Sequence, residues 1–441
     1  MFASFFLTAI LQVPAPPVPQ EEPPEEITPA PFFEGDIPST GLADARMTAF
    51  DQAMRDFLRE GEIPGATLAI SKDNRLIYSR GFGYSDFEAQ TPMQPDALMR
   101  VASLSKPVTA TMVFLLEQEG KLKFKDPILR RLDPKLHRGQ PPADSRWASI
   151  TLLQLLQHRA GFDRKLSGDP AFYAQGLGRE LGLKTPADKT EVISAMLQRP
   201  LDFNPGERYA YSNLGYSLLG RAIESVTGLN YEDAVKQKLL TPLGIDRMYV
   251  GRTLRSEARE GEVVYYSSER VKSLVPGQRG KLVPAPYGAW IQPDLDAFGG
   301  WIASAPDILK LARIYDPTYA SGPLSSKSID KMFEHPKGKV PEANAPPWYG
   351  CGWEVRFYGN GRYNAWHTGS LPGSATLWVM RADGLSWVVL FNSRADNEDN
   401  YLSATIDPRL HKAASETQAW PEFDLFEKVP GTAPEDPIRT K

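Results

Sequence analysis

Ser103 and Lys106 stand three residues apart at the start of an apolar segment, SLSKPVTATMVFLLEQ. Residues three apart on a helix share a face, with their Cβ atoms about 5–6 Å apart, so the lysine amine can reach the serine hydroxyl. A lysine in an apolar helix is unfavourable without a partner, and burial lowers its pKa so that the neutral amine can act as a base. The alternative is that Ser103 caps the helix while Lys106 extends its charged end to water.

The same Ser-x-x-Lys spacing occurs a second time, at Ser328 and Lys331 in the polar stretch SSKSIDKMFEH. We interpret this copy as part of a solvated helix, because its surroundings would not bury the lysine. The spacing alone is therefore weak, and the apolar context is what favours the first copy.

A tyrosine and an asparagine form a second candidate group, in Tyr211-Ser212-Asn213 of the stretch NPGERYAYSNLGYSLLG. A tyrosine near a lysine can move a proton, and the asparagine amide can hold a substrate carbonyl and the lysine at once. The alternative for Asn213 is a cap on the helix predicted after it. The other Tyr-x-Asn copy, Tyr358 to Asn360, precedes Gly361 and is typical of a hairpin turn.

The third candidate group is His367-Thr368-Gly369-Ser370, on a predicted strand. A glycine on a strand lets another group approach the backbone closely. We expect His367 and Thr368 to line a cleft and the Ser370 N–H to stabilise an oxyanion. The alternative is that His367 is a partly exposed strand residue.

Strand patterns occupy the two ends of the chain and helical patterns the middle. ATLAIS and RLIYSRGFGY come early, after a helical pattern over 44–61, and GWEVRFY, RYNAWHTG, SATLWVMR and LSWVVLFN come late. The order predicts an α/β (α+β) fold: one antiparallel sheet built from both chain ends, flanked by helices, with an inserted, mostly helical subdomain. A cleft between the two parts is the natural place for a site.

These patterns set the expected boundaries. We expect one folded domain over 44–420, divided into a sheet subdomain (44–100 and 350–420) and a helical subdomain (101–349). A Pro- and Glu-rich linker over 17–43 is expected before it, and a tail over 421–441 after it. The apolar run at 1–16 is too short to span a bilayer and suits a secretory signal peptide, although it lacks a basic residue. This predicts secretion or a periplasmic location, with the cytoplasm as the alternative.

The composition limits the class of function. The 441 residues carry a formal net charge of -4, five histidines and one cysteine. One cysteine excludes an internal disulfide, and the scattered histidines do not predict a zinc site. Glycine-rich nucleotide motifs and long basic blocks are missing, so we expect no cofactor, no metal and no nucleic-acid partner.

The three groups, in this order along the chain, resemble the serine β-lactamase and penicillin-binding-protein superfamily. The tyrosine-first middle motif is similar to class C β-lactamases, D,D-peptidases, D-aminopeptidases and family VIII carboxylesterases. VASLSKPVTATM, ITLLQLLQHRAGF, FGGWIASAPDILKLA and WHTGSLPGSATLWV extend the resemblance over residues 44–400.

The resemblance implies a role for each residue of the three groups. Ser103 would be the acylated nucleophile, with Lys106 and Tyr211 moving the protons, in an order that the sequence leaves open. Asn213 would orient Lys106 and the substrate amide, and the N–H groups of Ser103 and Ser370 would form the oxyanion hole. The substrate-binding residues would be Asn213, His367, Thr368, Gly369 and Ser370.

One departure bears on the substrate. His367 stands where β-lactamases and D,D-peptidases usually have lysine, and a histidine with its ordinary pKa of about 6.5 is mostly neutral at pH 7. We therefore expect a monomeric serine hydrolase that acts on esters or D-amino-acid amides and uses a small or peptide-like substrate, which could derive from the cell wall. A β-lactamase or D-Ala-D-Ala carboxypeptidase, or a peptidoglycan-binding pseudoenzyme, are the alternatives.

Overall fold

The structure is a computed structural model that describes residues 33, 35–316, 322–338 and 345–427. The predicted signal peptide at 1–16 and most of the predicted linker lie outside these residues. Within the described ranges, no helix is long and apolar enough to cross a lipid bilayer.

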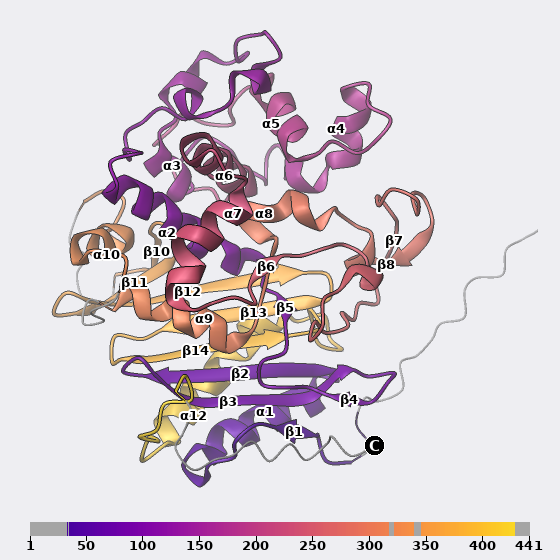
Figure 1. Ribbon diagram of the computed structural model, residues 1–441, viewed down its shortest axis with the longest axis vertical. Helices are drawn as coiled ribbons and strands as arrows, with labels where there is room; N and C mark the ends of the chain where they lie inside the picture. Colours follow the sequence, from indigo (N-terminus) through magenta and orange to yellow (C-terminus); the bar gives the residue numbers. More distant parts are fainter. Residues whose placement is uncertain (1–32, 34, 317–321, 339–344, 428–441) are drawn as a thin grey trace, which may run out of the picture. The chain divides into compact units, whose positions relative to one another are not determined.

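One large antiparallel sheet joins the two ends of the chain, as predicted (Figure 1). Its strand order is β1-β3-β2-β14-β13-β12-β11-β10, with β4 attached to β3. The bounds are β1 Ser39–Thr40, β2 Gly65–Lys72, β3 Arg75–Asp86, β4 Thr91–Pro92, β10 Trp348–Tyr349, β11 Glu354–Gly359, β12 Arg362–Leu371, β13 Ser374–Met380 and β14 Leu385–Phe391.

The pairing of β2 with β14 closes this sheet. It runs from Ala66 opposite Phe391 to Lys72 opposite Leu385, and Figure 1 shows the purple early strands beside the yellow late ones. Tight turns set the register of the hairpins on either side, because their turn residues adopt the left-handed backbone that such turns require. Asp73 and Asn74 form one such pair, with φ of 50° and 64°. Asn360 and Gly361 form the other, with φ of 51° and 71°.

Each face of the sheet packs on its own set of helices, because successive side chains of a strand point to opposite faces. Along β14, Trp387, Val389 and Phe391 belong to a core that also holds residues of α1 and α12. Val388 and Leu390 belong to the larger core shared with α2, α6 and α9. The bounds are α1 Thr48–Glu60, α2 Ser105–Gln118, α6 Asn213–Thr227, α9 Ala305–Ala312, α11 Leu402–Thr405 and α12 Asp407–Glu416.

The segment inserted between the early and late strands is mostly helical. α2 lies at its centre: its residues from Ser105 to Leu116 are all buried, in accordance with its continuous apolar sequence. The remaining α-helices are α3 Leu152–Leu156, α4 Ala174–Glu180, α5 Lys189–Leu197, α7 Tyr231–Val235, α8 Asp296–Gly299 and α10 Ser326–Phe333. The loop-rich part predicted at 251–300 contains a short hairpin of β7 Arg270–Lys272 and β8 Leu282–Pro284, with 3₁₀ turns around it.

A second, three-stranded sheet brings the start of α2 next to α8. It consists of β5 Met99–Arg100, β9 Trp301–Ala303 and β6 Tyr249–Val250. The Val101 N–H donates to the Trp301 carbonyl at 3.0 Å, immediately before the predicted nucleophile. Two segments 200 residues apart in the sequence are thus held side by side.

The fold extends beyond the predicted boundaries at both ends. β1 lies in the predicted linker and pairs with β3, and the nearby Ile37 is buried. In the predicted tail, Asp424 accepts the Leu76 N–H at 2.9 Å and the Leu425 N–H donates to the Leu76 carbonyl at 2.7 Å. Both segments were misjudged because backbone pairing on a sheet edge depends little on side-chain type.

Candidate active site

Ser103 lies in a single 3₁₀ turn, Ala102–Leu104, that leads into α2. Ala102 has a φ of 48°, which an alanine rarely adopts and which places strain next to the serine. α2 begins only at Ser105, and no side chain caps it. Ser103 is therefore not the helix cap that the alternative interpretation required.

Three of the predicted residues meet at one oxygen atom. The Lys106 Nζ lies 3.0 Å from the Ser103 Oγ, and the Tyr211 hydroxyl donates to the same Oγ at 2.9 Å. Lys106 is fully buried, so it does not extend to water. Its Nζ also donates to the Phe298 carbonyl at 2.9 Å, which fixes the amine from the α8 side.

Burial shifts the pKa values of both groups around Ser103 toward their neutral forms. Burial lowers the pKa of Lys106 well below its usual range; Arg164 lowers it further, and only Asp169 opposes the shift. Burial raises the pKa of the Tyr211 phenol, although the hydrogen bond with Ser103 opposes this change. The arrangement therefore favours a neutral amine and a protonated phenol on either side of the serine.

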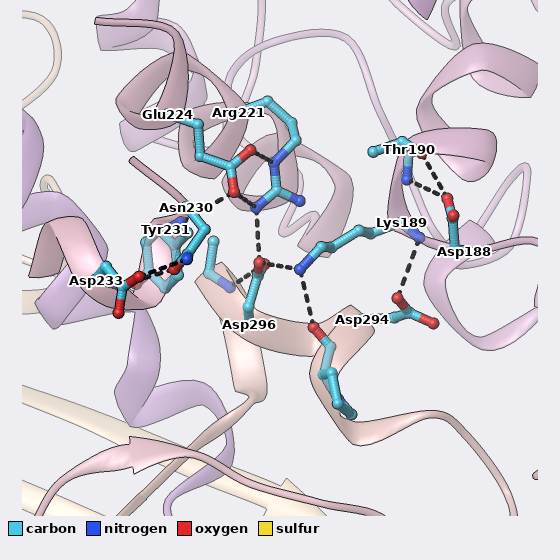
Figure 2. A network of polar contacts seen from close by, with 12 residues as sticks. Asp188, Lys189, Thr190, Arg221, Glu224, Asn230, Tyr231, Asp233, Asp294 and Asp296 are labelled. Carbon is cyan, nitrogen blue, oxygen red and sulfur yellow. Dashed lines mark hydrogen bonds and ion pairs between the residues drawn. The ribbon is translucent and has the colours of Figure 1, made fainter. Parts of the chain in front are cut away.

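A buried ion-pair network holds α8 in place behind Lys106 (Figure 2). Asp296, the first residue of α8, contacts the Arg221 guanidinium at 2.6 Å and the Lys189 amine at 2.5 Å. Asp296 and Arg221 are both almost inaccessible to water, so each charge depends on the other. The network fixes the short helix whose Phe298 carbonyl binds Lys106.

The close approach that the sequence predicted for Gly369 is present. A Cβ at this position would lie 2.2 Å from the Thr376 Oγ1 and 2.5 Å from the Val101 carbonyl oxygen. Only glycine therefore lets β12 run against residues 101–103. β11 pairs with β12 no further than Glu354 opposite Trp366, so residues 367–371 keep one free edge beside Ser103.

His367 is buried in the wall of the site and is held at both ring nitrogens. Its Nε2 lies 3.0 Å from the Tyr349 hydroxyl, and its Nδ1 lies 2.7 Å from the Thr368 carbonyl oxygen. Burial is the main cause that lowers its pKa to about 3. The partly exposed histidine of the alternative interpretation is not observed.

Asn213 is the first residue of α6, and Ser212 rather than Asn213 is the cap. The Asn213 amide donates to the Asp169 carboxylate at 2.7 Å. Among the described residues, its buried Oδ1 has no hydrogen-bond partner. The structure thus joins Asn213 to a carboxylate that the sequence analysis did not single out.

A cavity of about 790 Å³ opens in front of these residues. Thr368 and Ser370 point into it from the exposed face of β12. The remaining wall divides into an apolar part and a charged part. The apolar part is Phe172, Ala289, Trp290, Leu295 and Phe298; the charged part is Arg164, Glu269, Glu354 and Arg394.

The second copies of the motifs lie elsewhere. Ser328 and Lys331 are on α10, where Ser328 is buried against Gln118 and Lys331 pairs with Glu334. α10 also buries Ile329, so it is an amphipathic helix rather than a fully solvated one. Asn360 is in the hairpin turn between β11 and β12, as expected.

Comparison with known proteins decides the family. The family model described as Beta-lactamase matches residues 50–407, which is most of the chain and includes all three motifs. The chain belongs to the Beta-lactamase family. Esterase EstB of Burkholderia gladioli is 30% identical over 293 residues, covering 65% of this chain and 67% of the esterase.

Two further proteins are similar to this chain over a greater length. Penicillin-binding protein 4* of Bacillus subtilis is 24% identical over 365 residues, 82% of this chain and 74% of that protein. The D-amino acid amidase of Ochrobactrum anthropi, solved with D-phenylalanine, has a TM-score of 0.64 at 22% identity, covering 85% of this chain and all of that one. This last likeness supports the fold alone.

Several residues at the site of this Beta-lactamase-family chain were missed by motif reasoning. They are His158, Arg164, Asp169, Phe172, Trp290, Tyr349, Glu354 and Arg394. Only His158 carried a signal, as part of the stretch ITLLQLLQHRAGF that matched the family. The others lie in segments without a motif and reach the site only through the fold.

Proposed function

We propose that the chain is a serine hydrolase that cleaves esters or D-amino-acid amides through an acyl-enzyme. The observation that carries this proposal is the meeting of the Lys106 amine and the Tyr211 hydroxyl at the Ser103 Oγ, at 3.0 and 2.9 Å. A serine becomes a nucleophile when an adjacent base accepts its proton. An unused site would not need a fully buried lysine at this position.

The proposed reaction begins with Lys106 as the base, because its pKa is lowered whereas that of Tyr211 is raised. The Ser103 Oγ attacks the substrate carbonyl carbon and its proton passes to the Lys106 Nζ. The N–H groups of Ser103 and Ser370 stabilise the oxyanion of the tetrahedral intermediate. The scissile bond then breaks, and the leaving oxygen or nitrogen receives a proton through Tyr211.

Deacylation repeats these steps with water. Lys106 accepts a proton from the water that attacks the acyl carbonyl, and the Ser103 Oγ regains a proton as the acid product leaves. The apolar wall formed by Phe172, Trp290 and Leu295 suits the acyl group of such a substrate.

The neutral His367 supports esters and amides over substrates that need a fixed positive charge at this position. Its pKa of about 3 keeps the ring uncharged at neutral pH. The esterase relative, which is 30% identical, supports hydrolysis of an ester bond.

A second candidate function is hydrolysis of substrates that carry a carboxylate, such as β-lactams or D-Ala-D-Ala peptides. Arg394 favours it, because its guanidinium lines the cavity and donates to the hydroxyls of Ser370 and Tyr401. No ion pair with an acidic residue is found for Arg394 in the described part of the chain.

The test compares a short-chain p-nitrophenyl ester with a chromogenic cephalosporin, for the native protein and for Ser103→Ala. We expect ester turnover that Ser103→Ala abolishes while the thermal midpoint stays unchanged, with little cephalosporin turnover. Fast cephalosporin turnover that Arg394→Gln removes would favour the second candidate. Ester turnover that persists in Ser103→Ala would refute both.

A further inference from the structure

His158 lies behind Tyr211 and has no part in the reaction as described above. It is buried and adopts a φ of 54°, which a histidine takes up rarely. Its segment pairs with the one that leads to Tyr211: the Ala210 N–H donates to the His158 carbonyl at 2.9 Å, and the Gly206 N–H donates to the Arg159 carbonyl at 2.7 Å.

The His158 ring holds the peptide group on the other side of Tyr211. The Ser212 N–H donates to the His158 Nδ1 at 3.2 Å. One residue therefore binds the N–H of Ala210, before Tyr211, with its carbonyl, and the N–H of Ser212, after Tyr211, with its ring. The backbone of His158 is left-handed at this point, and its carbonyl and its ring both bind N–H groups of the same short segment.

The ring also packs against two of the tyrosines that line the cavity. Its centroid is 4.3 Å from that of Tyr211 and 4.4 Å from that of Tyr349, and the Tyr349 hydroxyl contacts His367. His158 is thus packed against the phenol that donates to Ser103 and against the residue that holds the opposite wall.

We propose that His158 is a positioning residue that fixes Tyr211 by binding the N–H groups of the residues before and after it, Ala210 and Ser212. This inference rests on the proposed function, in which the Tyr211 hydroxyl must meet the Ser103 Oγ. A misplacement of about 1 Å in such a group can lower a rate about 100-fold.

The ring must be the neutral form that carries its hydrogen on Nε2, because Nδ1 accepts a hydrogen bond. Protonation would put a second N–H opposite the Ser212 N–H. Burial lowers the pKa of His158 well below its usual range, and the positive charge of Arg164 lowers it further. Both effects favour the accepting form.

The first experiment compares His158→Asn with His158→Gly. Both residues tolerate the left-handed backbone, but only asparagine has a side-chain oxygen that can take the place of Nδ1. We expect the glycine variant to release p-nitrophenol about 100-fold more slowly with KM changed less than about threefold. The asparagine variant should release p-nitrophenol at least about tenfold faster than the glycine variant. His137→Asn, which changes a histidine away from the cavity, is the matched control and should keep the native rate.

Equal rates in the native protein and the glycine variant would overturn the proposal. So would an equal loss in both variants at unchanged thermal midpoints, because the acceptor would then not matter. A second measurement uses the native protein, so it does not depend on whether a variant folds. ¹⁵N–¹H NMR should show the His158 ring hydrogen on Nε2, and a hydrogen on Nδ1 would contradict the proposal. If the native protein shows no turnover that depends on Ser103, the proposed function fails, but the NMR result still decides the hydrogen position.

Discussion

At the scale of single residues, the site depends on side chains that are uncharged here, although the same side chains are charged in water. Lys106 is fully buried and its Nζ contacts two oxygens, those of Ser103 and Phe298. A neutral amine is what a base requires, and burial supplies it without a second basic residue. The protonation states thus follow from the packing of α2 and α8 around the amine.

The first prediction concerns the pH dependence of the reaction. Because the neutral form of Lys106 is the active one, activity should be present above its lowered pKa and be lost as the pH falls through that value. The measurement is kcat/KM of the ester between pH 5 and 10, with buffers of constant ionic strength. An acidic limb near the ordinary lysine pKa of about 10.4 would contradict the prediction.

Lys106→Arg tests the same point by substitution. Arginine keeps the positive charge but is not deprotonated in proteins, so kcat should fall about 10²–10⁴-fold. Lys310→Arg, which changes a half-buried lysine of α9 that does not line the cavity, serves as the control and should leave kcat unchanged. Native activity in Lys106→Arg would exclude the lysine as the base.

A further prediction concerns His367, whose pKa is lowered to about 3. The ring should stay neutral from pH 8 down to pH 5 and gain a proton only near pH 3. The chemical shift of its ring C–H groups, followed by NMR during a pH titration, should therefore be constant over that range. A titration near pH 6.5 would mean that the ring is more exposed to water than the structure indicates.

The residues that motif reasoning found are those whose chemistry is visible in a short stretch. Ser103, Lys106 and Tyr211 were identified because three spaced motifs occurred in order, and the structure brings them together. Arg394 and Asp169 could not be found this way. An arginine or an aspartate in a loop is usually solvated, and only the folded chain places these two beside Ser370 and Asn213.

At the scale of the elements, the site is a contact between β12 and the turn before α2. Gly369 makes this contact possible, since any side chain there would meet Thr376 and the Val101 carbonyl. α8 supports Lys106, just after this turn, through the Phe298 carbonyl. Each element contributes a backbone group as well as side chains, so small shifts of either one should affect the reaction.

Gly369→Ala should therefore separate β12 from the nucleophile. The new Cβ would lie 2.5 Å from a backbone oxygen that cannot move independently, so we expect kcat to fall about 100-fold. Gly215→Ala is the matched control: it is on α6, where the nearest atom would be at an ordinary 3.6 Å. Steady-state kinetics of the ester with both variants would check this, and equal activities would contradict the close contact.

The buried network of Figure 2 should contribute to stability. Asp296→Asn removes one of the two carboxylates that pair with the buried Arg221, the other being that of Glu224, and breaking such a buried pair costs about 3–5 kcal/mol. Asp233→Asn, in the exposed acid that binds Asn230, should cost less than about 1 kcal/mol. Urea unfolding of both variants gives the two free energies, and similar small losses would show that the network is replaceable.

The elements themselves were mostly predictable from the sequence. The alternation in SATLWVMR and LSWVVLFN and the turn at Asn360-Gly361 gave the late strands, and the fully apolar α2 was clear from its composition. β1 and the segment around Asp424 were not predictable, because two residues of backbone pairing or a single carboxylate leave no periodic pattern.

At the scale of the whole molecule, residues distant in the sequence complete the same sheet. Asp424 accepts the N–H groups of Leu76 and Phe426, which ties the segment after α12 to β3. Nearby, the Arg75 guanidinium donates to the Glu422 carbonyl. These contacts attach the segment that was predicted to be a free tail.

Asp424→Ala should lower the free energy of unfolding by about 1–3 kcal/mol, because it removes a charged acceptor from two backbone N–H groups. The measurement is urea unfolding, with Glu427→Ala, an exposed acid three residues further along the chain, as the control. Equal stability of the two variants would mean that this segment is only loosely attached.

The pairing of β2 with β14 has a consequence for how the chain is made. Ala66 and Phe391 are partners although roughly 300 residues separate them, and at about 5–20 residues per second their synthesis takes roughly 15–60 s. During that time the edge of β2 that will receive β14 has no strand beside it, which exposes it to wrong pairing. High separation between partners also slows folding itself. A chain released before residue 391 would already contain Ser103, Lys106 and Tyr211, yet it would lack the strand that joins the two halves of the sheet.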